Sequence, residues 1–292
     1  MRSFDQSLKY LLQQAPADFI RFGLADPGVR VLGSVPSVLP SRGRDVDGAY
    51  LIARGADEQL IHVELHRRHQ SATEIGTDVA EAQVRLFRRE RRLVVSHLWD
   101  LYGNRDAPVR EERRFPFGAD GSVCVYHRVN LRALSWEQLL LRAPPALWGL
   151  VALTRDGATE QVIERARDAI EARDALTHAA RADHLAVLSF VAEAEGVPTT
   201  LVRSVVPEEK LMESGLYKEI FGKGEARGKA EGKAEGKAEG ILAVLEARGI
   251  AVSDTVRARI LGCTDVATLD AWIRRAAVAP TAAAVVRTRS RS

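Results

Sequence analysis

The chain has 292 residues, of which 46% are hydrophobic and 28% are charged, and its formal net charge is +3. This length and hydrophobic content suffice for about two folded domains and exclude an intrinsically disordered protein. Only two cysteines occur, Cys124 and Cys263, which excludes a secreted disulfide framework and a zinc ribbon. Residues 1–10 lack the pattern of a signal peptide, and no apolar run reaches about 18 residues. We therefore expect a cytoplasmic protein with no membrane partner.

The first part of the chain predicts two short helices followed by a β-hairpin. Residues 5–22 carry apolar side chains at helical spacing, and Ala15-Pro16 breaks this pattern into two segments. A stretch rich in proline, glycine and serine at 27–43 predicts a loop that contains one short strand at most. Two β-rich runs follow at 48–53 and 59–65, and the turn-like residues between them predict an antiparallel pair of strands.

A helix and two further strands complete this half of the chain. Ser71 and Glu74 have the spacing of a capping box, and the apolar residues that follow fall on one face of a helix. Further β-rich runs occupy 93–99 and 123–129. A strand, a crossover helix and a second strand normally form a right-handed parallel connection. We therefore expect an α/β fold in which helices flank a mixed sheet.

Five arginines gather at the end of the predicted helix. They fall within eight residues that contain a single acid, Glu90, so the local net charge is +4. Such a cluster suits the phosphates of DNA, although the solvated end of a helix gives the same pattern. The predicted DNA-binding residues are Arg85, Arg88, Arg89, Arg91 and Arg92. No lysine occurs between Lys9 and Lys210, so a mechanism that needs a lysine in this half must use Lys9 or none.

An acidic pair is predicted at one end of the hairpin. Side chains alternate between the two faces of a strand, so His62, Glu64 and His66 project from one face. Asp47 begins the partner strand, which places its carboxylate near that of Glu64. Two converging carboxylates would bind a hard divalent cation such as Mg²⁺. Such an ion activates water and neutralises the charge that develops on a phosphodiester.

The second half of the chain is predicted to be helical. Residues 151–221 form a helical extension, and Gly-Lys-Ala-Glu repeats then occupy 222–240. The repeats are either a flexible charged tether or frayed helix, or a helix whose glycine stripe forms a homo-oligomer contact. Like charges four residues apart destabilise an isolated helix, which favours the tether. A small helical module at 241–279 and a disordered basic tail at 280–292 complete the chain.

Several short blocks of sequence, spread over nearly the whole chain, resemble those of one known family. The blocks are Phe4-Asp5-Gln6-Ser7-Leu8-Lys9, Arg44-Asp45-Val46-Asp47-Gly48, Leu60-Ile61-His62-Val63-Glu64, Asp100-Leu101-Tyr102, Leu211-Met212-Glu213-Ser214 and Leu269-Asp270-Ala271-Trp272-Ile273. In this order they resemble the YhgA-like (Rpn) family of recombination-promoting nucleases, which is also linked to putative transposases. The resemblance implies a restriction-endonuclease-like core of the PD-(D/E)xK type at 1–150. It also implies metal-dependent endonuclease action on DNA, with Mg²⁺ or Mn²⁺ as the cofactor.

The resemblance assigns a role to each residue of the acidic site. Asp47 corresponds to the first metal-binding acid, Glu64 to the second, and the Leu65 carbonyl to a backbone ligand. His66 departs from the pattern, because the wider nuclease class has lysine there and this family commonly has glutamine. A histidine could position or deprotonate water, supply a nitrogen ligand that favours Mn²⁺, or mark lost activity. The alternative is therefore a catalytically inactive, DNA-binding or self-associating relic. Gln83 and Arg85 either reach the site or a phosphate, or belong to an ordinary polar helix face.

Overall fold

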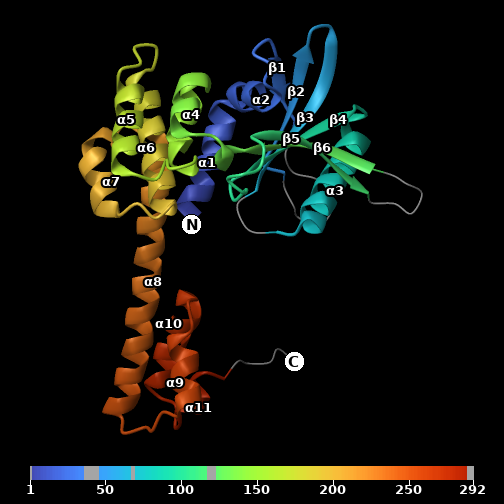
Figure 1. Cartoon of the computed structure of the whole chain (residues 1–292). Coiled ribbons are helices and arrows are strands. Elements are labelled where there is room, and N and C mark those ends of the chain that lie inside the picture. The colour runs from blue at the N-terminus through green and yellow to red at the C-terminus, as the bar shows by residue number, and fades with distance from the viewer. Residues whose placement is uncertain (1, 36–45, 67–69, 117–122, 288–292) are drawn as a thin grey trace. The chain divides into compact units, whose positions relative to one another are not determined.

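The structure is a computed structural model that describes residues 2–35, 46–66, 70–116 and 123–287 (Figure 1). The chain divides into two compact units, Met1–Lys218 and Glu219–Ser292. The first unit combines a β-sheet with helices, whereas the described part of the second unit contains helices and no strand. The predicted acidic pair and the arginine cluster both belong to the first unit.

A six-stranded mixed sheet forms the centre of the first unit. Its strands are β1 (Arg30–Ser34), β2 (Gly48–Arg54), β3 (Asp57–His66), β4 (Val94–Asp100), β5 (Arg110–Pro116) and β6 (Val123–Asn130). They lie in the order β1-β2-β3-β4-β6-β5. The first three strands pair antiparallel, β4 is parallel to both β3 and β6, and β5 pairs antiparallel with β6 at the edge. The predicted hairpin, the parallel crossover connection and the mixed α/β sheet are confirmed.

Two helices cover one face of the sheet (Figure 1). α1 (Arg2–Gln14) and α2 (Pro16–Leu24) are the two segments that the break at Ala15-Pro16 predicted. On α2, the ring of Phe19 packs on the buried Trp99 of β4 with a centroid separation of 4.6 Å. Burial of two large aromatic side chains stabilises this contact and fixes the helices against the sheet.

A third helix, α3 (Ala72–Glu90), covers the opposite face of the sheet. Its residue Val79 packs with Leu98 of β4 in an apolar cluster. The predicted capping box is confirmed, because Ser71 Oγ accepts the N–H of Glu74 and the Glu74 carboxylate accepts the N–H of Ser71. These bonds satisfy backbone donors that the first turn of a helix leaves without partners.

The rest of the first unit is helical. Its elements are η1 (Leu131–Ala133), α4 (Trp136–Arg142), η2 (Pro145–Leu153), α5 (Glu160–Glu171), α6 (His178–Ala194), α7 (Thr199–Val205) and η3 (Glu208–Lys210). Tyr10 of α1 donates a hydrogen bond of 2.6 Å to Asp183 of α6, which ties this region to the helices on the sheet. The predicted domain boundary after residue 150 falls inside η2, most of which is buried. The predicted core and extension therefore form one packed unit.

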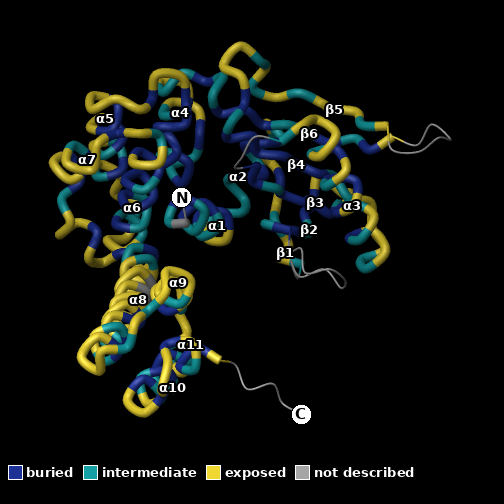
Figure 2. Tube along the Cα trace, turned by 90° about the horizontal axis from the view of Figure 1, so that it is seen from below, coloured by how far each residue is buried: buried dark blue, intermediate teal, exposed yellow. Residues whose placement is uncertain are grey.

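The repeat tract is part of one long helix. The helices here are α8 (Gly215–Ala247), α9 (Asp254–Leu261), α10 (Val266–Ala276) and α11 (Ala282–Val285). The prediction of a flexible tether at 222–240 is wrong, because α8 is continuous through the repeats. Ala234, Ala238 and Ile241 are buried in a core with Trp272, and this packing supplies the stability that the repeat lacks as an isolated helix. Most of the remaining surface of the repeat tract is exposed (Figure 2).

The predicted disordered tail also needs correction. α11 lies within the predicted tail, and Val285 is fully buried in the core of the second unit. Arg275 donates to the carbonyl of Val285 at 3.1 Å, which fastens this turn to α10. The alanines and valines of the tail are apolar enough to pack, so the disorder predicted for 280–287 is wrong. Residues 288–292 lie outside the described residues.

Candidate functional site

The structure brings Asp47 and Glu64 together at one end of the β2–β3 hairpin. The strand register pairs Gly48 with Val63, so Asp47, one residue earlier, lies opposite Glu64. The N–H of Asp47 is directed to Glu64 Oε2 at 3.5 Å. Asp47 Oδ2 accepts the N–H of Leu65 at 2.9 Å. The two carboxylates of the predicted site are therefore neighbours on adjacent strands.

Asp47 is held in an environment that disfavours its charge. Its side chain is only 3% exposed. Burial, and then the neighbouring charge of Glu64, raise the pKa of Asp47 to about 6. The hydrogen bond from Leu65 and the ammonium of Lys9, whose Nζ lies 3.1 Å from Asp47 Oδ1, act in the opposite direction. A buried carboxylate beside a second carboxylate is an arrangement that a bound cation would stabilise.

Glu64 is the more accessible of the two acids. Its side chain is 36% exposed, and Oε2 lies 3.4 Å from Nε2 of the buried His62. His62 Nδ1 lies 3.0 Å from Ser96 Oγ on β4, so the ring is held between the two strands. His62 therefore lies beside the Glu64 carboxylate, part of which stays open to solvent.

His66 is directed to a carboxylate that the sequence did not indicate. The parallel register of β3 and β4 pairs His66 with Asp100, and His66 Nδ1 lies 3.5 Å from Asp100 Oδ1. Arg128 Nη2, on β6, lies 2.6 Å from Asp100 Oδ2. Burial would raise the pKa of Asp100, but the contact with His66 and the charge of Arg128 outweigh it and lower the pKa. The signal in the sequence was the position of Asp100 at the end of a β-rich run, since parallel pairing places strand ends side by side.

The residues present fit a divalent ion that keeps most of its water. No group of three or more His, Cys, Asp or Glu side chains with the geometry of a metal site occurs in the parts of the chain that the structure describes. Mg²⁺ is commonly bound through one or two carboxylates with several waters, so Asp47 and Glu64 are sufficient as side-chain ligands. Leu65 contributes its N–H to Asp47, and the role of its carbonyl as a ligand stays a prediction.

Arg92, the last residue of the arginine cluster, lies at the opposite end of β3 from the acidic pair. Arg92 pairs with Glu58 at 2.7 Å, near the start of β3, whereas Glu64 is near the end of the same strand. Six residues of strand, at about 3.3 Å each, separate these positions by about 20 Å. Arg92 therefore cannot contact the phosphate that the acidic pair would bind.

Three of the five arginines already have acidic partners. Arg85 pairs with Glu81, Arg89 with Glu90 and Arg92 with Glu58. Among the described residues, Arg88 and Arg91 form no ion pair. The positive charge available to DNA is therefore smaller than the sequence suggested.

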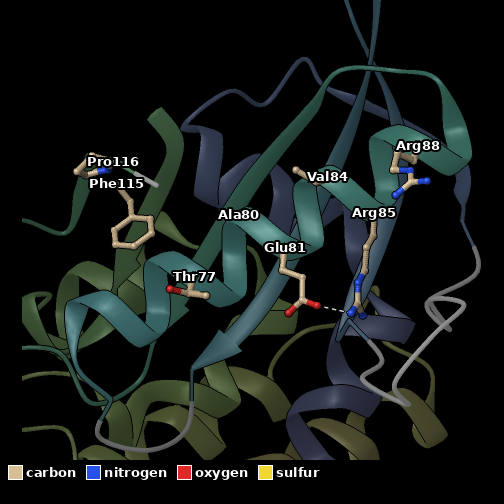
Figure 3. Close-up of a pocket in the computed structure, with 8 residues that line it drawn as sticks. All are labelled: Thr77, Ala80, Glu81, Val84, Arg85, Arg88, Phe115 and Pro116. Atoms are coloured by element: carbon tan, nitrogen blue, oxygen red, sulfur yellow. Dashed lines mark hydrogen bonds and ion pairs between the residues drawn. The ribbon is translucent and has the colours of Figure 1, made fainter. Parts of the chain in front are cut away.

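A groove on the outer side of α3 includes part of the arginine cluster (Figure 3). Its volume is about 860 Å³. Its lining residues are Thr77, Ala80, Glu81, Val84, Arg85, Arg88, Phe115 and Pro116. In Figure 3 the Arg85 side chain reaches back to Glu81, so the charge of one arginine is balanced inside the groove.

Gln83 has a structural role. Its Nε2 donates to the carbonyl of Val125 at 2.8 Å, and its Oε1 lies 3.2 Å from Cys124 Sγ, so it joins α3 to β6. The expectation that Gln83 reaches the acidic site is therefore not supported, and neither is its alternative as an ordinary polar helix face.

Comparison of the chain with models of known protein families, with curated proteins and with solved structures found no match. None of the helices in the described residues is long and apolar enough to span a membrane.

Proposed function

We propose that this chain is a divalent-metal-dependent endonuclease that hydrolyses phosphodiester bonds of DNA, with a restriction-endonuclease-like core similar to that of the YhgA-like (Rpn) family. The observation that carries the proposal is the buried Asp47 beside Glu64 at one end of the β2–β3 hairpin. The mixed sheet with helices on both faces agrees with such a core. An action in DNA recombination, on mobile elements or in defence follows from the resemblance.

Each residue of the acidic site has a defined task in this proposal. Asp47 and Glu64 would hold Mg²⁺ or Mn²⁺, with the Leu65 N–H fixing the orientation of the Asp47 carboxylate. When bound, the ion neutralises charge on the phosphodiester and lowers the pKa of a coordinated water. His66 would act from the edge of the site, since its ring lies beside Asp100.

A second candidate function is that of a catalytically inactive relic of the same fold. The observation that favours it is the His66–Asp100 pair, which stands where the wider nuclease class has a lysine. In this alternative the acidic pair has no need of a metal ion, and the arginine cluster keeps a DNA-binding or self-associating role.

A plasmid-nicking assay tests the proposal. Wild-type protein should nick supercoiled DNA with Mg²⁺ or Mn²⁺ and not with EDTA. Asp47→Asn and Glu64→Gln should each be as inactive as wild type in EDTA, because each variant removes one of two charged ligands. Glu137→Gln is the control, since it changes an exposed glutamate of α4 that belongs neither to the acidic pair nor to the arginine cluster, and it should leave nicking unchanged.

The position of His66 separates the two candidates. If wild type fails to nick DNA with every divalent ion tested, while His66→Lys gains nicking, the inactive relic is the correct function. Nicking that survives both Asp47→Asn and Glu64→Gln would show that the acidic pair is not the site.

A further inference from the structure

Lys9 contacts the acidic pair from a helix far away in the sequence. Its Nζ lies 3.1 Å from Asp47 Oδ1, while the other oxygen of this carboxylate, Oδ2, accepts the N–H of Leu65. Asp47 therefore has one oxygen fixed by the backbone and one that faces a cation. A divalent ion shared with Glu64 would need the oxygen that Lys9 now contacts.

The position of Lys9 is fixed by the packing of α1. Leu8 and Leu12 of this helix are fully buried. Tyr50, on β2, donates to the carbonyl of Leu12 at 3.4 Å, and Tyr10 bonds to Asp183 of α6. The helix is thus anchored on both sides, so the fold places Lys9 beside Asp47.

Lys9 is also the only lysine in the first 209 residues of the sequence. The next lysine is Lys210, which pairs with Glu171 in the helical region. The position two residues after Glu64 is His66, and its ring is directed to Asp100. Among the described residues, the lysine beside the acids therefore comes from α1 and not from β3.

We propose that Lys9 is the resident cation of the acidic pair. Its ammonium contacts Asp47 Oδ1 until a divalent ion binds this oxygen, and the ammonium then moves beside the phosphodiester. This inference rests on the proposed nuclease function. The side chain of Lys9 is 43% exposed, so its ammonium has room to move from Asp47 to a phosphate oxygen. A lysine ammonium on a flexible four-carbon chain suits both positions.

The first test measures Mn²⁺ binding to the full chain without DNA, by titration calorimetry. Lys9→Gln should bind Mn²⁺ about tenfold more tightly than wild type, because it removes a unit charge about 5 Å from the ion in a solvated site. Lys9→Arg should bind like wild type, because it keeps the charge. Lys210→Gln is the matched control, since it removes a paired lysine of the same unit and should change nothing. A misfolded Lys9→Gln would bind more weakly, so it cannot imitate the expected result.

The second test measures nicking at saturating Mn²⁺. Lys9→Gln should lower kcat about a hundredfold with a smaller change in KM, as expected for the loss of a charge that acts on the transition state. Lys9→Arg should restore most of this loss. If Lys9→Gln matches wild type in Mn²⁺ affinity while Asp47→Asn abolishes binding, the inference about Lys9 is wrong and the metal site stands. A wild-type protein that neither binds Mn²⁺ nor nicks DNA would overturn the proposed function itself.

Discussion

Replacement of Asp47 by asparagine should stabilise the protein at neutral pH. The wild-type carboxylate is buried beside Glu64, and the folded protein must keep it ionised at a cost. Asparagine has nearly the same shape, and its amide oxygen can still accept the N–H of Leu65. The substitution therefore removes an unfavourable charge with little loss of packing. A residue of the proposed active site would in this case lower the stability of the fold that contains it.

The magnitude follows from the pKa of Asp47, which folding raises from 3.8 to about 6. Between these values the folded state binds more protons than the unfolded state, so the free energy of unfolding falls as the pH rises through this window. At 1.36 kcal/mol per pKa unit, the ionised carboxylate costs about 3 kcal/mol above pH 6. Asp47→Asn should therefore be more stable than wild type by up to about 3 kcal/mol at pH 8, and this advantage should largely disappear at pH 4.

The assay is urea unfolding at pH 4, 5, 6 and 8, followed by tryptophan fluorescence in the absence of divalent ions. A Trp272→Phe background leaves only tryptophans of the first unit as reporters. Glu58→Gln is the control, because its exposed ion pair with Arg92 should contribute less than about 1 kcal/mol at any of these pH values. If Asp47→Asn is no more stable than wild type at pH 8, or if its advantage is equal at pH 4 and pH 8, the electrostatic argument for the acidic pair is refuted.

Two further predictions concern the arginine cluster and the repeat helix. Arg88→Ala combined with Arg91→Gly should make the plot of the logarithm of the association constant for duplex DNA against the logarithm of salt concentration less steep. The slope should fall in magnitude by about 1.8, since each lost phosphate contact removes about 0.9. Glycine suits position 91 because its φ is +55°, and an unchanged salt slope would show that the cluster is an ordinary solvated surface. In the second unit, Gly232→Ala with Gly236→Ala should raise the free energy of unfolding by about 2 kcal/mol, because an added Cβ meets nothing within 4 Å at either position. Ala238→Gly, which changes a buried position of the same helix, should lower the stability, and thermal melts that rank these variants otherwise would contradict the packing described for α8.

The sequence predicted those parts of the fold that have a clear hydrophobic period or an end signal. The β2–β3 hairpin and the capped helix α3 are of this kind. β5 was missed, because Arg110–Pro116 is an edge strand whose first five residues are charged and which has little burial. Its side chains show no β pattern, and the strand exists because its backbone pairs with that of β6.

The repeat helix shows a different limit of sequence analysis. Local propensity correctly predicts that glycines and like charges four residues apart weaken an isolated helix. The decisive contribution came from distant residues, since Ala234 and Ala238 pack in one core with Leu269 and Trp272. Tertiary packing of this kind outweighs propensity in most proteins. A reading of residues 222–240 alone could not have found it.

For the candidate site, the alternation of strand side chains was sufficient to bring Asp47 and Glu64 together, but not to show which groups surround them. Lys9 and Asp100 both depend on the order of strands and helices in space, which a single hairpin does not define. Lys9 reaches the site because α1 packs on the sheet, and Asp100 reaches His66 because β4 runs parallel to β3.

The separation of the acids from the arginines constrains how a DNA duplex could use both. The acidic pair lies at the end of β3, and Arg92 is bound to its beginning, about 20 Å away. Successive phosphates of one strand of DNA lie about 3.4 Å apart along the helix axis, so this distance corresponds to about six base pairs. A duplex that contacts both ends must therefore run along the direction of β3 and α3. Arg92 would then bind a phosphate about half a helical turn from the scissile bond, where it would add affinity without taking part in the chemistry.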